Sequence, residues 1–192
     1  MKKVIALLVA MSTTAVFAGV DYASKYIYRG QTVSTSAAIQ PSMDTNVLGL
    51  DIGAWASYDT GNDEFQEVDF SVGYDVTEVA GVGVSVGLTE YIYTAQASQD
   101  EADTEASLFL DYSVAGIDLS AALNKTIDGA TGDYTILGAS YGFDISASLA
   151  GSVSYEVGTL DDGTTDDEAY SAITVAADLG TFAGLDVGVA YT

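Results

Sequence analysis

Arg29 is the side chain with the most distinctive chemistry in this sequence. The chain carries 28 Asp and Glu residues against 5 Lys and Arg, and after residue 18 its only cations are Lys25, Arg29 and Lys125. A guanidinium stays charged at physiological pH and can bind a carboxylate through two parallel hydrogen bonds. The expected partners of Arg29 are acids on other strands, namely Glu67, Asp69, Asp51 and Asp111. Such a pair is either a structural ion pair or part of a constriction that sorts solutes by charge.

Residue types on which most enzymes depend are missing from this chain. It has no cysteine and no histidine. This removes disulfides, thiolate chemistry, the usual general base of nucleophilic catalysis and the commonest transition-metal ligand. We therefore expect neither an enzyme nor a bound cofactor. The net charge of −23 would repel nucleic-acid phosphates, so nucleic-acid binding is excluded as well.

Two segments superficially resemble ligand-binding loops. Residues 161–168 hold five acids around Gly163, but their spacing is not that of an EF-hand calcium loop. Weak binding of divalent cations on a solvated loop is the expected behaviour. The segment Gly81-Val82-Gly83-Val84 lies inside a strand pattern with no helix after it, so it is not a nucleotide-binding loop.

The first eighteen residues have the pattern of a secretory signal peptide. Lys2 and Lys3 form a basic start, residues 4–10 form an apolar stretch, and Val16-Phe17-Ala18 forms a small-residue cleavage site. We predict that residues 1–18 are removed on export and that residues 19–192 form a single domain.

Alternation of apolar and polar residues dominates the rest of the chain. Leu50, Ile52 and Ala54, for example, share one strand face, and Asp51 shares the other with Gly53. The pattern predicts eleven strands, at residues 20–29, 38–45, 50–59, 68–75, 82–94, 106–114, 117–124, 133–141, 145–156, 168–179 and 185–191. On the first of these strands, Arg29 would share a face with Asp21 and Lys25.

The connections between the predicted strands alternate in length. Long acidic segments such as 95–104 and 159–167 alternate with short ones such as Ala115-Gly116 and Gly142-Phe143. Tyrosines gather near the strand ends, as they do in the interfacial girdles of membrane proteins. Most predicted strands are long enough to cross a bilayer, which takes about 9 to 11 tilted residues. The predicted fold class is therefore an all-β, antiparallel, transmembrane up-and-down β-barrel.

Two points about this fold stay open. A soluble, acidic β-sandwich is the alternative, because its apolar faces would pack against each other. Eleven strands also conflict with the even number found in bacterial single-chain barrels. We expect twelve strands when the barrel is complete. Either residues 31–37 contain another crossing, or the sequence stops before its last strand, and we favour the second explanation.

A Ser-x-Tyr-x-x-Arg-Gly element spans residues 24–30. Further along come Ser34, Gln40-Pro41, Gly53-Ala54-Trp55-Ala56-Ser57, Glu67-Val68-Asp69 and Gly73-Tyr74. In these residues the chain resembles the TorF-type porins, most strongly over residues 20–94. The resemblance implies a small outer-membrane barrel that passes solutes. It also implies a further strand and a terminal aromatic residue, which this sequence lacks.

These features predict a bacterial outer-membrane, porin-like barrel for the passive passage of small solutes. Acids lining the lumen would give it a preference for cations. The expected lumen or constriction residues are Arg29, Lys25, Asp51, Glu67, Asp69, Asp111 and Asp118, with Asp186 as a further lumen acid. The expected partners are outer-membrane lipid and small solutes or cations. Two alternatives remain, a structural or interaction barrel with a plugged lumen and a soluble secreted sandwich.

Overall fold

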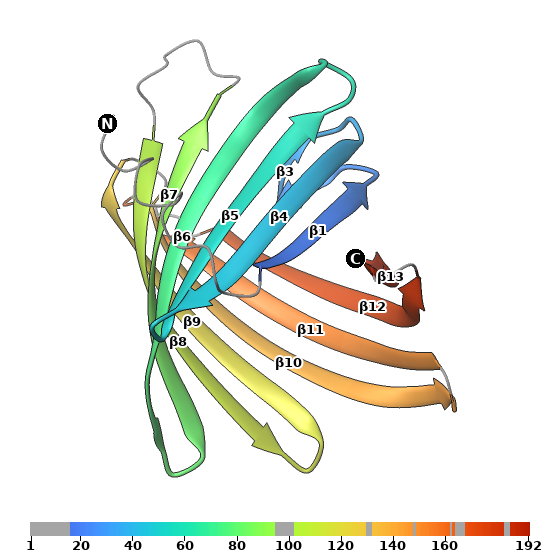
Figure 1. Ribbon diagram of the computed structural model, residues 1–192. Coiled ribbons are helices and arrows are strands. Elements are labelled where there is room, and N and C mark those ends of the chain that lie inside the picture. Colours follow the sequence, from blue (N-terminus) through green and yellow to red (C-terminus); the bar gives the residue numbers. More distant parts are fainter. Residues whose placement is uncertain are drawn as a thin grey trace.

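The computed structural model describes residues 16–94, 102–129, 132–147, 149–161, 163, 168–182 and 185–192, which form an all-β fold (Figure 1). Its strands are β1 (Val16–Ala23), β2 (Tyr26–Tyr28), β3 (Gln31–Ser34), β4 (Ala38–Val47), β5 (Leu50–Asp59), β6 (Glu64–Val79), β7 (Val82–Tyr93), β8 (Ala102–Val114), β9 (Ile117–Asp128), β10 (Asp133–Ser146), β11 (Leu149–Asp161), β12 (Glu168–Phe182) and β13 (Leu185–Tyr191). Nowhere in these residues is there a helix with the length and apolarity needed to cross a membrane.

Eleven of the strands form one large antiparallel sheet, in the order β1-β4-β5-β6-β7-β8-β9-β10-β11-β12-β13. The predicted antiparallel all-β fold is thereby confirmed, and the sheet has as many strands as the alternation pattern gives, eleven. The sheet is strongly curved, and Figure 1 shows β1 at one edge and β13 at the other. It is not closed, because the described residues of β1 and β13 do not pair with each other.

The connections divide the sheet into two ends. At one end, here called the turn end, two-residue turns join β4 to β5, β6 to β7 and β8 to β9. At the other, the loop end, longer connections join β5 to β6, β7 to β8 and β11 to β12. The first connection at the loop end contains β2 and β3, which form a separate two-stranded sheet.

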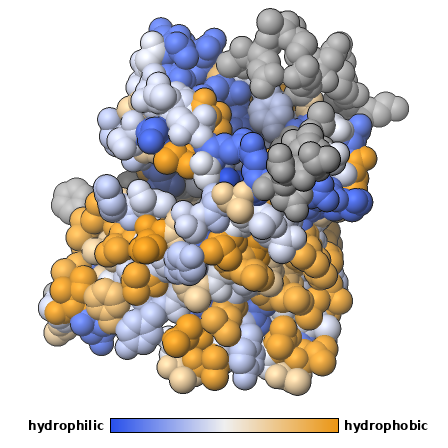
Figure 2. Space-filling model, turned by 180° about the vertical axis from the view of Figure 1, so that it is seen from behind, coloured by the Kyte–Doolittle hydropathy of each residue, from blue (hydrophilic) through white to orange (hydrophobic). Residues whose placement is uncertain are grey.

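Alternation gives the two faces of the large sheet opposite character. The convex face exposes large apolar side chains along every second residue, among them Phe70, Val72 and Tyr74 of β6 and Ile173 and Val175 of β12. Figure 2 shows such residues gathered over the half of the molecule nearer the turn end, with polar residues above them. In the described residues no second large sheet covers this face, which argues against the sandwich alternative.

The concave face is polar. The residues buried there include the following side chains: Ser57, Asp59, Glu67, Glu105, Ser107 and Asn124. Buried apolar residues are few in the described chain, and two of the four are tyrosines. The molecule thus has polar groups inside and apolar groups outside, the reverse of the usual distribution in a water-soluble domain.

The first predicted strand, residues 20–29, is wrong in its second half. β1 ends at Ala23, the chain bends at residues 24–25, and residues 26–34 turn inward as a hairpin made of β2 and β3. We call residues 26–34 the inner hairpin. Alternation could not reveal the bend, because apolar and polar residues alternate in a hairpin arm as they do in a continuing strand. Residues 31–37 are not a further crossing of the sheet, since β3 pairs with β2 alone.

Gly142-Phe143 is not a turn, contrary to the prediction. Both residues lie within β10 and pair with β11, and the connection comes after Ser146. Ile145 therefore lies near the end of β10 and does not begin the next strand. The error arose because Ile145 and Leu149 continue the apolar alternation through the turn itself.

Three turns at the turn end share one backbone conformation. Leu48-Gly49, Ala80-Gly81 and Ala115-Gly116 each have positive φ at both residues, with φ of 56°, 53° and 53° at the first position. The residues on either side of each turn pair with each other across the two strands, as Val114 does with Ile117. These are features of the type I′ turn, whose twist matches that of the flanking strands.

Two substitutions at one of these turns should change stability in opposite directions. The change A115N should raise the free energy of unfolding by about 1 kcal/mol, because Asn accepts a positive φ more readily than Ala. The change G116A should lower it by a similar amount. An added Cβ would meet only an ordinary contact, 3.8 Å from Tyr141, so the cost comes from the φ of 80°. Urea unfolding in detergent, followed by fluorescence, measures both changes. Shifts of the same sign would contradict the type I′ assignment.

Candidate functional site

The inner hairpin lies against the concave face near the loop end, and Figure 1 shows β3 within the curve of the sheet. It bends back at Arg29-Gly30, where φ is 46° and 78°, so this turn too has positive φ at both residues. The tip approaches β12 closely. A Cβ on Gly30 would lie 2.4 Å from the Cβ of Tyr170, a separation that no side chain could occupy. Glycine is required here by both the backbone and the space.

Arg29 is held by a carboxylate and two aromatic rings. Its Nη1 and Nη2 atoms donate to Glu105 Oε2 and Oε1 at 2.6 and 2.8 Å. The guanidinium carbon lies 4.7 Å from the ring centroid of Tyr28 and 4.3 Å from that of Tyr134. The two charged side chains are 10% and 4% exposed. This is a buried, bidentate ion pair with cation–π contacts on its faces.

The partner of Arg29 differs from all four acids that the sequence suggested. Because Arg29 is at the tip of a hairpin and not on an edge strand, it crosses the concave side and reaches β8. Burial by itself lowers the pKa of Arg29, but the hydrogen bonds and charge of Glu105 outweigh it, and the net pKa is raised. The guanidinium therefore stays charged.

Tyrosine hydroxyls extend the contacts of the inner hairpin. The Tyr28 hydroxyl donates to the Tyr91 hydroxyl at 3.0 Å, which in turn donates to Glu105 Oε1 at 3.1 Å. The Tyr26 hydroxyl donates to Glu67 Oε2 at 2.8 Å. Burial is the main cause that raises the pKa of both Tyr26 and Tyr28. Both hydroxyls consequently remain protonated donors.

Two more donors anchor the second arm of the inner hairpin. Gln31 Nε2 donates to Glu168 Oε2 at 3.0 Å, and Ser34 Oγ donates to Asp59 Oδ2 at 2.6 Å. With Tyr26 and Arg29, these residues make four side chains of the hairpin that donate to carboxylates of the sheet. The acids come from β5, β6, β8 and β12. The hairpin therefore ties together strands that are far apart in the sheet.

Of the other predicted site residues, Glu67 belongs to this cluster and Asp69 lies beside it, whereas the rest lie elsewhere. Lys25 is exposed and forms no ion pair among the described residues. Asp51 accepts a hydrogen bond from Asn46 at the turn end, and Asp118 accepts one from Ser113. Asp69, beside Glu67, has a buried Oδ1 atom with no hydrogen-bond partner in the described part of the chain. The side chain of Asp186 is outside the described residues.

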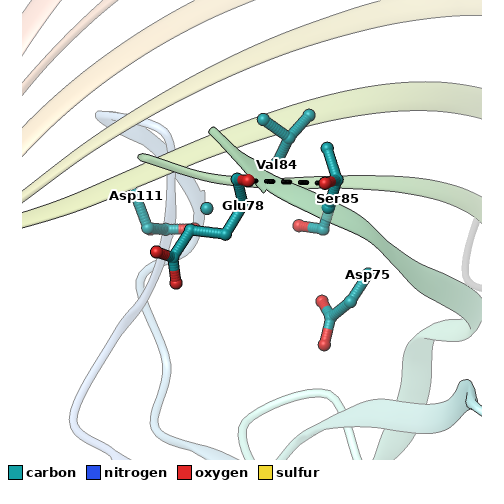
Figure 3. Close-up of a pocket in the computed structure, with 7 residues that line it drawn as sticks. Asp75, Glu78, Val84, Ser85 and Asp111 are labelled. Atoms are coloured by element: carbon teal, nitrogen blue, oxygen red, sulfur yellow. Dashed lines mark hydrogen bonds between the residues drawn. The ribbon is translucent and has the colours of Figure 1, made fainter. Parts of the chain in front are cut away.

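Asp111 lines a separate hollow near the turn end. The hollow has a volume of about 320 Å³ and is lined by Asp75, Thr77, Glu78, Gly83, Val84, Ser85 and Asp111. Figure 3 shows the carboxylates of Asp75, Glu78 and Asp111 around it, at separate points. In the described residues, no group of three or more acids is arranged to hold a metal ion.

One of the comparisons with known proteins finds a match. A family model described as "Bacterial protein of unknown function (Gcw_chp)" matches residues 9–192. The chain belongs to the Gcw_chp family. No curated protein and no solved structure matches it. For this Gcw_chp member, the residues of the inner hairpin and their partners are thus the direct guide to function.

Sequence reasoning missed Glu105, Tyr91 and Tyr134 as members of the site. Glu105 was assigned to the border of a long loop, although it continues the polar face of Ser107 and Asp111 by alternation. A second signal was present in composition. Residues 22–43 contain no acid, in a chain with 28 of them. An acid-free segment is the one that can approach an acidic wall at low electrostatic cost.

Loss of the Arg29 charge should destabilise this Gcw_chp protein substantially. The change R29M leaves Glu105 buried without its partner, which typically costs about 3–5 kcal/mol. The double change R29M/E105L should cost less than R29M alone, because no unpaired charge remains. Urea unfolding in detergent, followed by the fluorescence of the single tryptophan, Trp55, reports both.

The matched control breaks an exposed ion pair. Lys125 Nζ lies 2.8 Å from Asp133 Oδ2, with both side chains open to solvent. K125M should change the free energy of unfolding by about 1 kcal/mol at most. Equal losses for R29M and K125M would refute a special role for the buried pair.

The contact between the hairpin and Asp59 should make the stability of the protein depend on pH. Asp59 ends β5, beyond the apolar stretch of that strand. The Ser34 hydroxyl and the backbone N–H groups of Asn62 and Gly61 hold the pKa of Asp59 below its usual 3.8, despite its burial. Because the folded pKa is the lower one, this stabilisation is present above about pH 4 and is lost as the pH falls through the folded pKa.

The variant D59N tests this dependence. It should be less stable than the wild type at neutral pH, and the difference should shrink as the pH falls from about 5 to about 2. The control D21N changes a carboxylate with no hydrogen bond in the described residues, and at neutral pH it should lower the stability much less than D59N does. A D59N difference that does not vary with pH would contradict the role of the charge.

Proposed function

We propose that this protein is an outer-membrane β-barrel that lets small cations pass through an acidic lumen, with a constriction formed by the inner hairpin. The apolar convex face carries this proposal. An uncovered apolar surface over so many strands is unfavourable in water and is suited to the hydrocarbon of a bilayer. Polar residues on the convex face are found toward the loop end, as in Thr104, Lys125 and Asp133, where headgroups and water would meet the barrel.

The acids of the concave face support the preference for cations. Asp51, Asp69, Asp111 and Asp118 alternate with apolar residues of the convex face, so they face the lumen. Arg29, the cation of the inner hairpin, is neutralised by Glu105. The field in the lumen is therefore negative, which raises the local concentration of cations and lowers that of anions.

The inner hairpin supports a narrow passage at the loop end. Its anchors reach β5, β6, β8 and β12, so it crosses the space enclosed by the curved sheet. Eight-stranded barrels are filled by their own side chains, and sixteen-stranded porins hold an open channel. A barrel of eleven or twelve strands is intermediate in diameter. In such a barrel a two-stranded insert would leave little room beside it.

The same contacts favour a second candidate, a structural or interaction barrel whose lumen the hairpin seals. The two functions differ in conductance. A sealed barrel would carry no ion current in a planar bilayer, whereas a constricted one would show small, stable channels.

The deciding experiment starts with fractionation of the expressed protein and continues with reconstitution. The protein should appear in the outer membrane and migrate as a heat-modifiable species on detergent gels. In bilayers under a KCl gradient at low salt, the reversal potential should show potassium permeating in preference to chloride. Equal permeation of the two ions would rule out the proposed selectivity, and a soluble protein would rule out the barrel.

Removing the constriction should increase the current. Replacing residues 25–36 with a short Gly-Ser linker should raise single-channel conductance severalfold while keeping the preference for potassium, because the wall acids remain. K125M, which changes only an exposed ion pair at the loop end, should conduct as the wild type does. Absence of current in the wild type together with current in the linker variant would identify the sealed barrel.

A further inference from the structure

The pocket around the Arg29 guanidinium is built largely by the sheet and not by the hairpin. Glu105 comes from β8, Tyr91 from β7 and Tyr134 from β10. We propose that Glu105, Tyr91 and Tyr134 form a binding site for guanidinium cations on the wall of the lumen, which the chain fills with its own Arg29. The proposal rests on the proposed passage of cations and names the class of cation that the constriction would prefer.

The geometry of the pocket fits a guanidinium better than other cations. Both oxygens of Glu105 accept from two different nitrogens of Arg29, at 2.6 and 2.8 Å, an arrangement that needs a planar fork of donors. The ring of Tyr134 covers the flat face of the group at 4.3 Å. A potassium ion has no donors, and an ammonium group is not planar. Neither could satisfy the carboxylate and the aromatic face in the same way.

The carboxylate keeps its orientation without Arg29. The Tyr91 hydroxyl donates to Glu105 Oε1 at 3.1 Å, and the Ser107 hydroxyl donates to the same atom at 3.5 Å. Glu105, Ser107 and Tyr134 are all buried, and the backbone that carries each of them is paired within the sheet. The pocket is therefore already formed when a cation arrives, which limits the entropy lost on binding.

The turn position of Arg29 allows the pocket to be emptied without strain in the turn itself, although Glu105 then loses its partner as in R29M. A residue with φ of 46° is favourable for Gly or Asn. The change R29G therefore removes the guanidinium but keeps the turn, and R29N gives the Asn-Gly pair preferred in type I′ turns. Both variants are used so that the test survives a failure of either one to fold.

Isothermal titration of the detergent-solubilised full chain with methylguanidinium chloride, at constant ionic strength, tests the site. R29G and R29N should bind methylguanidinium at least about tenfold more tightly than the wild type, whose pocket is filled. They should also bind it at least about tenfold more tightly than potassium or tetramethylammonium. R29G/E105Q should lose this binding. Binding to R29G and R29N no tighter than to the wild type, or unchanged binding in R29G/E105Q, would overturn the proposal.

A stability measurement gives a second readout. Millimolar methylguanidinium should raise the urea midpoint of R29G, observed through Trp55, whose ring centroid is 5.5 Å from that of Tyr26 in the inner hairpin. Equal concentrations of KCl should not raise the urea midpoint of R29G. The midpoint of K125M should respond to methylguanidinium as that of the wild type does. An equally small shift of the urea midpoint in R29G and K125M would also overturn the proposal.

The failure of this site and the failure of the proposed function are distinguishable. Binding is measured without a membrane, so a protein that binds methylguanidinium but carries no current refutes the passage of ions and leaves the site intact. A protein that conducts potassium but in which R29G and R29N do not bind methylguanidinium refutes the site alone.

Discussion

The alternation of side chains along paired strands is the constraint on which this structure depends. Neighbouring strands hold their residues in register, so a period of two in each strand becomes two uniform faces across the whole sheet. One face is apolar and the other is acidic. Neither face can be changed on one strand alone without placing a charge among apolar neighbours, or an apolar residue among acids. The same alternation therefore determines both the apolar character of the convex face and the negative charge of the concave face.

An acidic concave face creates a problem that the inner hairpin solves. Carboxylates crowded at low dielectric raise one another's free energy unless donors or cations reach them. The chain has few cations, so it supplies mainly neutral donors. Tyr26, Gln31 and Ser34 each donate to a different acid, and Arg29 neutralises Glu105. The hairpin is thus an electrostatic complement of the wall as well as an obstacle in the space it occupies.

The sequence predicted the sheet much better than the site. Strand number, antiparallel order and the polar and apolar faces follow from a local pattern, which each segment carries in its own residues. The position of Arg29 does not. It depends on a bend at residues 24–25 and on contacts between Arg29 and Glu105 of β8, which lies 76 residues further along the chain. Alternation assigns Arg29 to a face, but only the fold of the first connection decides which acid it meets. Ile145 shows the same limit, since an apolar pattern that continues through a turn hides the turn.

The number of strands in the sheet has a geometrical consequence for its two edges. Because each strand is antiparallel to the next and there are eleven, β1 and β13 run in the same direction. Direct contact between them would make a parallel seam, with slanted hydrogen bonds unlike those of every other pair in the sheet. A single strand inserted between them would instead be antiparallel to both. Because both edge strands run in the same direction, the gap between them can accept one strand that runs in the opposite direction and pairs with both.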